Sequence, residues 1–406
     1  MNEINSPKHW KNVQLKEIAS LRRESIQPEN DLCLNYVGLE HIDSGESQLK
    51  RWGNASEVKS TKSRFYANDI LYGKLRAYLD KVVIAEMEGI CSTDILVVTA
   101  NSKTIPRFLV YLLHTQPLIR HAVATSTGVN HPRTSWNSLG EFVLALPPLS
   151  EQRAIAHVLQ TIQEAKFTRQ REIELERERR AALMEYLFSH GTKGEPRKQT
   201  EIGDIPESWE IVQLKEIANL RRENVKPKDS QNLNFVGLEH IDSGESTLKR
   251  WGDASAMKSA KNRFYPDDVL YGKLRSYLDK AVIAEMDGIC STDILVFAAN
   301  SKILPRFLVY LLHTETFVNH AVATSTGISH PRTSWDSLGK FTFTLPSLPE
   351  QRAIAAVFQA IDEKTAALER EVEHLAELFH TMLDELMTGQ RSAVPLIVKQ
   401  DSSHEG

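Results

Sequence analysis

The strongest constraint in this sequence is an internal duplication. Residues 10–160 match residues 209–359 without a gap, at a constant offset of 199. Roughly 70% of the paired positions are identical, and whole phrases recur, such as Val37–Ser47 at Val236–Ser246. A period of this length is far too long for a solenoid and favours a duplicated domain. We therefore predict two units, each a globular head of about 140 residues followed by a long helix.

Both units end in a long predicted helix. The first covers about 149–189 and the second about 348–388. Proline precedes each start, which suits a first turn because proline lacks the amide that would stay unpaired there. Gly191 and Gly389 follow the last apolar residues and are typical C-terminal caps. At ~1.5 Å per residue such a helix spans roughly 60 Å, which exceeds the width of a small domain.

The apolar residues of the two helices predict that the helices pair. In the second helix they recur at alternating steps of three and four, as Ile361, Leu368, Val372, Leu375, Phe379, Met382 and Leu386. The first helix has a weaker seam of Ile155, Val158, Ile162, Ile173, Leu183 and Leu187, with Arg169, Glu176 and Arg180 at positions where apolar residues are expected. Such a seam needs a partner helix, and the other copy is the obvious one. The alternative is that each helix packs separately on its own head.

The predicted fold is α+β. Two mixed α/β heads lie in tandem, separated by two long helices that form an antiparallel coiled coil with pseudo-twofold symmetry. The expected segments are head 1 (1–148), helix 1 (149–190), a polar linker (191–206), head 2 (207–347), helix 2 (348–389) and a polar tail (390–406). Within head 1 we expect strands at 36–39, 69–72, 82–85, 94–98 and 142–146, a helix at 106–115 and a polar loop at 126–133.

Composition places the chain among ordinary globular proteins, with 41% hydrophobic and 25% charged residues. No apolar run approaches the roughly 18 residues of a membrane span, and the first ten residues lack a signal-peptide core, so we expect a cytoplasmic protein. The net charge of −4 does not favour nucleic acid. However, the acid is concentrated in helix 2, and residues 10–150 are nearly balanced, so charge alone neither supports nor excludes a DNA partner.

Catalytic signatures are weak or missing. The sequence has no phosphate-binding loop and no dinucleotide-binding glycine motif. Asp267–Asp268 could suggest a nuclease carboxylate pair, but the first copy has Asn68–Asp69, and no Asp/Glu-x-Lys motif follows at a suitable distance in either unit. Cys91 and Cys290 precede apolar runs and are interpreted as buried hydrophobic residues rather than nucleophiles. Neither the cysteines, Cys33 included, nor the histidines have metal-ligand spacing. We predict that this chain is not an enzyme and holds no metal and no cofactor.

The remaining polar loops carry side chains suited to nucleic acid. Lysine and arginine pair with phosphates, and the two-pronged guanidinium also suits guanine. The candidate DNA-binding residues of head 1 are Lys59, Lys62, Arg64, Tyr72, Lys74, Arg76, Ser126, Thr127, Asn130, His131, Arg133 and Ser135. Their copies in head 2 are Lys258, Lys261, Arg263, Tyr271, Lys273, Arg275, Ser325, Thr326, Ser329, His330, Arg332 and Ser334. The alternative for each charged residue is a solvated surface position.

The segment Leu-Pro-Pro-Leu-Ser-Glu-Gln-Arg-Ala-Ile-Ala at 146–156 leads into the first helix, and a close copy at 345–355 leads into the second. This pattern resembles the specificity (S) subunit of Type I restriction–modification systems, and the resemblance covers nearly the whole chain. It implies a non-catalytic, DNA-binding subunit in which each target-recognition domain reads half of a bipartite site and the helices set the spacing. It also implies two methyltransferase (M) subunits, which carry S-adenosylmethionine and methylate adenine, and restriction (R) subunits as further partners.

One departure from the family pattern changes the expected target. Members usually carry two dissimilar recognition domains, whereas the domains here are near-copies, so we expect double-stranded DNA with a palindromic, gapped site. Differences such as Val129–Asn130 against Ile328–Ser329 leave open a change of base preference in one half. Two other functions remain as alternatives. A protein-docking scaffold would bind M without DNA specificity, and an enzyme with an unrecognised site would be active alone.

Overall fold

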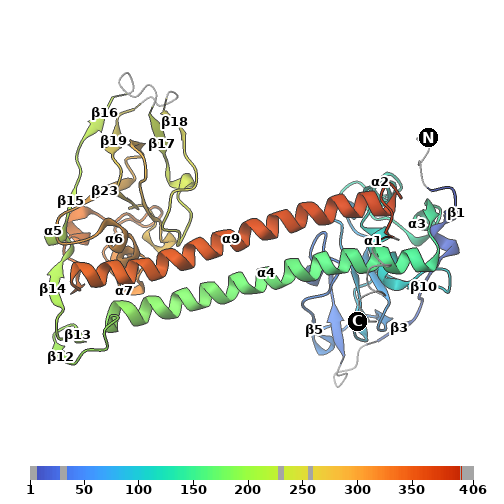
Figure 1. Cartoon of the computed structure of the whole chain (residues 1–406). Coiled ribbons are helices and arrows are strands. Elements are labelled where there is room, and N and C mark those ends of the chain that lie inside the picture. Colours follow the sequence, from blue (N-terminus) through green and yellow to red (C-terminus); the bar gives the residue numbers. More distant parts are fainter. Residues whose placement is uncertain (1–6, 28–33, 227–232, 255–258, 394, 396–406) are drawn as a thin grey trace, which may run out of the picture. The chain divides into compact units, whose positions relative to one another are not determined.

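The computed structural model contains two compact units (Figure 1). It describes residues 7–27, 34–226, 233–254, 259–393 and 395. Unit 1 comprises residues 1–169 and 371–406, and unit 2 comprises residues 170–370. Both long helices are present, as α4 (Leu149–His190) and α9 (Leu348–Met387), close to the predicted bounds. Each unit therefore contains one head together with portions of both helices.

The head of unit 1 is a mixed structure of short strands and helices, as predicted. Its strands are β1 (Lys11–Gln14), β2 (Ala19–Leu21), β3 (Ser25–Ile26), β4 (Asn35–Val37), β5 (Gly53–Asn54), β6 (Lys62–Phe65), β7 (Ile70–Gly73), β8 (Val82–Ile84), β9 (Gly89–Cys91), β10 (Ile95–Ala100) and β11 (Val143–Leu146). Its α-helices are α1 (Pro106–Leu113), α2 (Gln116–Ala124) and α3 (Trp136–Gly140). The predicted strands and the predicted helix are confirmed with shifts of one or two residues.

Three sheets organise this head. β1 pairs with β11, four strands run in the order β2-β10-β7-β8, and five run in the order β3-β6-β9-β4-β5. The pairings are antiparallel except for β4 with β9. Side chains alternate across the central four-stranded sheet. Ile70 and Tyr72 of β7 enter the core beneath the helices, whereas Leu71 enters a second core beneath the five-stranded sheet. The four-stranded sheet is thus buried on both faces.

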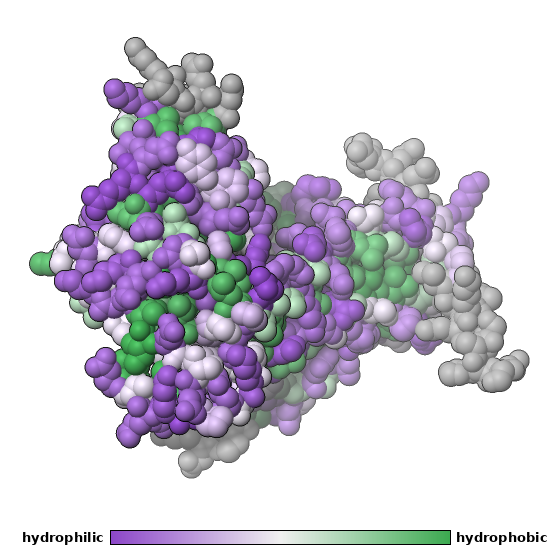
Figure 2. Space-filling view, turned by 60° about the vertical axis from the view of Figure 1, so that its left-hand side comes forward, coloured by the Kyte–Doolittle hydropathy of each residue, from purple (hydrophilic) through white to green (hydrophobic). Residues whose placement is uncertain are grey.

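The head of unit 2 repeats this architecture. Its strands are β14 (Glu210–Gln213), β15 (Ala218–Leu220), β16 (Asn224–Val225), β17 (Asn234–Val236), β18 (Gly252–Asp253), β19 (Lys261–Phe264), β20 (Val269–Gly272), β21 (Ala281–Ile283), β22 (Gly288–Cys290), β23 (Ile294–Ala299) and β24 (Thr342–Leu345). Its α-helices are α5 (Leu214–Ile217), α6 (Pro305–Leu312), α7 (Glu315–Ala323) and α8 (Trp335–Leu338). The sheet orders match those of unit 1 strand for strand. The side of unit 2 turned to the viewer in Figure 2 is largely hydrophilic, with apolar patches of limited extent.

The segment 191–206, predicted as a polar linker, lies within unit 2. It forms a two-stranded hairpin of β12 (Arg197–Thr200) and β13 (Gly203–Pro206). Lys198 Nζ donates to the carbonyl oxygens of Glu207 and Trp209, at 2.7 and 2.8 Å. These bonds tie the hairpin to the start of head 2. A polar sequence therefore acquires structure here through backbone pairing, which composition does not report.

The long helices pair antiparallel within each unit. In unit 1 the end of α9, through Phe379 and Leu386, joins the core that contains Ile155 near the start of α4. In unit 2 the end of α4, through Leu187, joins the core that contains Phe358 near the start of α9. Each helix start also packs on its own head, so the two packing arrangements weighed from the sequence coexist. The predicted fold class is confirmed.

The charged residues that interrupt the seam of α4 are paired with α9. The closest approaches are 2.7 Å for Arg169–Glu371, 2.6 Å for Glu176–Lys364 and 3.0 Å for Arg180–Asp362. A glycine with positive φ follows each helix, Gly191 at +70° and Gly389 at +74°, as the sequence predicts. The apolar pattern of the first helix is therefore weak because interhelical ion pairs replace apolar contacts at these positions.

Candidate nucleic-acid interface

In head 1, the loop after α2 is closed by its own backbone. The amide of Thr127 donates to the carbonyl of Arg133 and the amide of Arg133 donates back, both at 2.9 Å. The neighbouring Pro132 carbonyl accepts the amide of Arg76 at 2.8 Å, which joins this loop to the turn after β7. We call the two segments, residues 74–76 and 126–133, the loop cluster. Hydrogen bonds at its base leave its outer side chains to face solvent.

Arg133 is held in place by an acidic partner. Its Nε lies 2.9 Å from Oδ1 of Asp94 and its Nη2 lies 3.3 Å from Oδ2. The hydrogen bond from Arg133 keeps the pKa of Asp94 below its usual value, so the carboxylate stays charged. The Arg133 side chain remains 45% exposed. A guanidinium that is oriented but still accessible can bind a base edge or a phosphate with little loss of rotamer freedom.

The turn at Arg76 stores backbone strain. Arg76 has φ +53° and Asp80 has φ +48°, on either side of a short 3-10 turn. The second head keeps this conformation, with +54° at Arg275 and +47° at Asp279. A non-glycine residue in this region costs about 1–3 kcal/mol and tends to occur at functional sites. The exposed side chain of Arg76 is therefore directed outward by a strained turn present in both copies.

The tip of the loop cluster is apolar and fully exposed. Val129 is 99% exposed, and its copy Ile328 is 103% exposed. Gly128 precedes the tip with φ +100°, a conformation that glycine adopts without strain. Exposed Asn130 and His131 follow it. Below, Arg23, Lys74, Thr127, Arg133 and Ser135 are among the residues around a depression of about 300 Å³.

The structure brings together most of the predicted residues after β7 and α2, but not the others. Lys62 is buried, and its Nζ bonds to Ser60 at 2.5 and 3.0 Å. Arg64 pairs with Glu88 at 2.7 Å. Lys59 is exposed, and Lys258 lies outside the described residues. The basic residues of β6 are thus largely engaged within the head, and their copies Lys261 and Arg263 likewise contact Ser259 and Asp287.

Two predicted contact residues belong to the core. Tyr72 is 2% exposed and Tyr271 is 1% exposed. Burial raises the pKa of both phenols, which keeps them neutral. The Tyr-Gly-Lys sequence suggested a surface turn, but the turn begins one residue later, after Gly73 at the end of β7. We correct the prediction for these two tyrosines, because their side chains face the interior of the head.

Residues 7–177 and 206–378 match the family described as Type I restriction modification DNA specificity domain. The two matches follow the duplication and together span most of the chain. The chain belongs to this family. The predicted resemblance to S subunits of Type I restriction–modification systems is thereby confirmed.

Specificity subunits resemble the chain along nearly its whole length. It is 25% identical over 449 residues to the Type I restriction enzyme EcoDI specificity subunit of Escherichia coli, covering 97% of this chain and 95% of the relative. It is 24% identical over 410 residues to the MjaVIII specificity subunit of Methanocaldococcus jannaschii, covering 96% and 95%. The S subunit structure from M. genitalium aligns with a TM-score of 0.60 at 15% identity, over 95% of this chain and 97% of that chain. A chain from a structure of the type I R-M system aligns with a TM-score of 0.57 at 21% identity, over 95% of this chain and 99% of that chain. At these identities the structural matches establish the fold alone.

The Glu-Gln pair in the first turn of each long helix has a structural role. Gln152 has no exposed surface. Its Nε2 donates to the carbonyls of Lys103 and Pro147, both at 3.0 Å, and its Oε1 accepts the Ile105 amide at 3.1 Å. Beside it, Glu151 accepts the indole N–H of Trp10 at 2.9 Å. The motif therefore fastens the helix start to its head and is not part of the loop cluster.

Sequence reasoning missed two contributors to the loop cluster. Asp94 orients Arg133, but it lies 39 residues away and was predicted only as the first residue of a strand. Arg23 lines the depression, and its repetition as Arg222 was the available signal. Cys91 is buried, as interpreted, and burial raises the pKa of its thiol to about 12. Cys33 lies outside the described residues.

The described residues contain no helix long and apolar enough to cross a membrane. In the same part of the chain, no three or more His, Cys, Asp and Glu side chains gather as metal ligands would.

Proposed function

We propose that this chain is the non-catalytic, DNA-reading subunit of a Type I restriction–modification complex and that each head reads one half of a bipartite site. The observation that carries the proposal is the loop cluster, built twice from matching residues. In head 2, Arg332 lies 3.0 Å from Asp293, and the amide of Arg275 donates to Pro331 at 2.8 Å. Bonds equivalent to those of head 1 thus present the arginine, the strained turn and the apolar tip in both copies.

The similarity of the two clusters supports matched half-sites. Direct readout depends on the donors and acceptors that reach base edges. Lys74, Arg76, His131 and Arg133 all have identical counterparts in head 2. A duplicated reader suits a palindromic, gapped site, because inverted half-sites present the same groups to each head. Among the candidate contact positions, the cluster differs only at Asn130, which is Ser329 in the second copy.

The proposed partners are double-stranded DNA and two M subunits, with R subunits as a further partner. S-adenosylmethionine would be bound by the M subunits and not by this chain. Such a complex acts on DNA in the cytoplasm. The acidic second helix suits protein docking rather than DNA binding, because the phosphate backbone of DNA would repel its negative charge.

The first experiment is single-molecule sequencing of methylated adenines in DNA from cells that express this chain with its cognate M subunit. We expect a gapped, palindromic motif methylated on both strands. The control is the M subunit alone, which should yield no such motif. An asymmetric gapped motif would retain the DNA-reading function and contradict matched half-sites. Methylation without sequence preference would favour a protein-docking scaffold, and activity of this chain alone would favour an enzyme.

Exchanging the loop tips tests whether they contribute to base choice. A chain with Val129→Ile and Asn130→Ser carries the same tip in both heads. If Asn130 contacts a base, the two half-sites of the natural chain differ at one position, and we expect this variant to make them match by changing the half-site of head 1 only, with a discrimination of about 1–3 kcal/mol. The reciprocal pair, Ile328→Val with Ser329→Asn, should change the other half-site. An unchanged motif in both chains would exclude base reading by the tip.

A further inference from the structure

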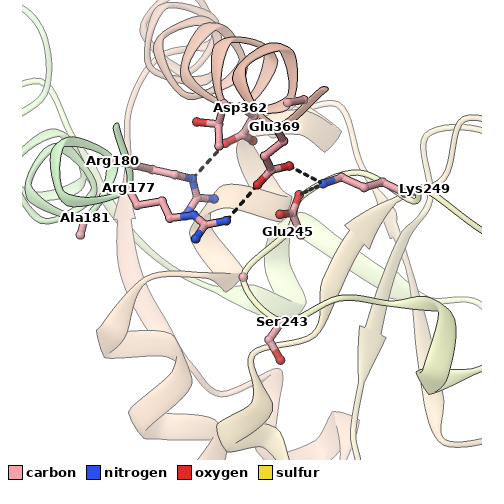
Figure 3. Close-up of a pocket in the computed structure, with 11 residues that line it drawn as sticks. Arg177, Arg180, Ala181, Ser243, Glu245, Lys249, Asp362 and Glu369 are labelled. Atoms are coloured by element: carbon pink, nitrogen blue, oxygen red, sulfur yellow. Dashed lines mark hydrogen bonds and ion pairs between the residues drawn. The ribbon is translucent and has the colours of Figure 1, made fainter. Parts of the chain in front are cut away.

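In unit 2 the facing surfaces of the long helices are charged (Figure 3). Arg180 and Arg177 of α4 point toward Asp362 and Glu369 of α9. Arg180 Nε lies 3.0 Å from Asp362 Oδ1, and Arg177 Nη2 lies 2.9 Å from Glu369 Oε1. Lys249 of the head also pairs with Glu369, with its Nζ 3.8 Å from the carboxylate. One turn away, Lys364 donates to Glu176 at 2.6 Å.

We call each pair of facing residues a layer, and the two layers that contain Arg180 and Glu176 have uncharged counterparts in unit 1. The offset of 199 pairs each residue of one helix with its copy in the other. The Asp362–Arg180 layer becomes Gln163–Phe379, and the Lys364–Glu176 layer becomes Ala165–Leu375. Phe379 is 4% exposed and packs edge-to-face on Tyr111, with the ring centroids 6.0 Å apart. Both members of each layer therefore differ between the two units.

The heads do not account for this divergence, because both present the same groups to the helices. In unit 2, Asp362 Oδ2 accepts from the Ser246 hydroxyl at 2.6 Å and from the Tyr310 hydroxyl at 3.0 Å. In unit 1, the corresponding serine and Tyr111 donate to Gln163 Oε1. Either helix start fits either head at this position. Any preference of one long helix for the other as its partner must therefore come from the residues of the helices themselves.

We propose that these layers make the pairing selective for the other half of the duplicated chain over a second copy of the same half. If α4 packed antiparallel on another α4, Arg180 would face Gln163 and Glu176 would face Ala165. If α9 packed on another α9, Asp362 would face Phe379 and Lys364 would face Leu375. Each self-pairing leaves partly buried charges without a partner, and uncompensated buried charge is strongly destabilising.

The layer nearest the middle of the helices discriminates less. Arg169 of α4 pairs with Glu371 of α9 at 2.7 Å. In a pairing of two α4 helices, Glu172 would replace Glu371 and supply the same charge. Selectivity therefore resides in the Asp362–Arg180 and Lys364–Glu176 layers. A protein with two near-identical heads depends on such selective helix contacts, because the heads alone would allow two copies of the same helix to pair equally well.

Three variants of the full-length chain imitate the alternative helix pairings at the layer of Arg180 and Asp362. Arg180→Phe places Phe opposite Asp362, as in an α9–α9 pair. Asp362→Gln places Gln opposite Arg180, as in an α4–α4 pair. The double variant recreates the layer that unit 1 already contains. We expect each single substitution to lower Tm by several degrees and the double variant to melt within about 2 °C of the natural chain, because residues in contact are not additive.

Unchanged Tm values for both single variants, or a double variant whose loss equals the sum of the two, would overturn the proposal. If Arg180→Phe fails to fold, the neighbouring layer provides the same test. Glu176→Lys and Lys364→Glu each oppose like charges and should lower Tm, and the exchanged pair Glu176→Lys with Lys364→Glu should recover it. These measurements use no DNA, so their outcome is independent of the proposed function.

Discussion

Alanine at both Arg133 and Arg332 is expected to weaken specific DNA binding by about 2 to 6 kcal/mol. Each arginine that reads a base contributes about 1–3 kcal/mol, and substitutions in separate heads should add. The Asp94 ion pair pre-orients Arg133, so little side-chain entropy is lost on binding. Fluorescence anisotropy with a duplex containing the methylated motif, titrated with the complex of this chain and its M subunits, measures the change. The single variants should each account for about half of it.

A matched control separates this effect from a general loss of charge. Arg51 and Arg250 are also exposed arginines paired with aspartates, one in each head, and lie outside the loop cluster. Alanine at both should leave the specific motif unchanged. Adding Asp94→Asn to the Arg133→Ala variant removes the carboxylate that would otherwise repel phosphates. Equal losses on all sequences with a shallower salt dependence would assign the arginines to phosphates, and undiminished affinity would exclude them from the interface.

Leucine at Gln152 or Gln351 is expected to destabilise its unit by about 3 kcal/mol or more. Gln351 has no exposed surface. It donates to the carbonyls of Lys302 and Pro346, at 3.0 and 2.9 Å, and accepts the Leu304 amide at 2.9 Å. Leucine would leave three backbone groups unpaired, one from a buried bond and two from partly buried bonds, and a buried unpaired group costs about 1–3 kcal/mol. Urea unfolding, monitored by circular dichroism, measures the loss in the free energy of unfolding.

The control for this prediction is Gln160→Leu, together with Gln359→Leu. These glutamines lie on the same helices and make one exposed bond each, to Glu164 and Glu363. Each of these substitutions should lower the free energy of unfolding by less than about 0.5 kcal/mol, as is usual at surface positions. If the buried and exposed glutamines prove equally dispensable, the Glu-Gln motif does not fasten the helix to the head. A loss of DNA reading at full stability would instead give the motif a direct functional role.

The sequence alone determined the architecture of this protein. The duplication, the bounds of both long helices and the glycine caps at Gly191 and Gly389 were all predicted and are confirmed. These features depend on local patterns, namely repetition, heptad spacing and backbone conformations that glycine favours, so neighbouring residues suffice to reveal them. The Ser126–Arg133 loop was likewise visible from its glycine and proline.

Only the tertiary structure decided which side chains meet. Arg180 breaks the apolar pattern of its helix, and its partner Asp362 lies 182 residues away. Tyr72 follows a strand pattern that turns its ring inward, although the adjacent Gly73 and Lys74 suggested a surface turn. The pairing of Arg133 with Asp94 depends on which strands become neighbours. Such contacts are set by topology, because a side chain's partners are chosen by long-range packing and not by its neighbours in sequence.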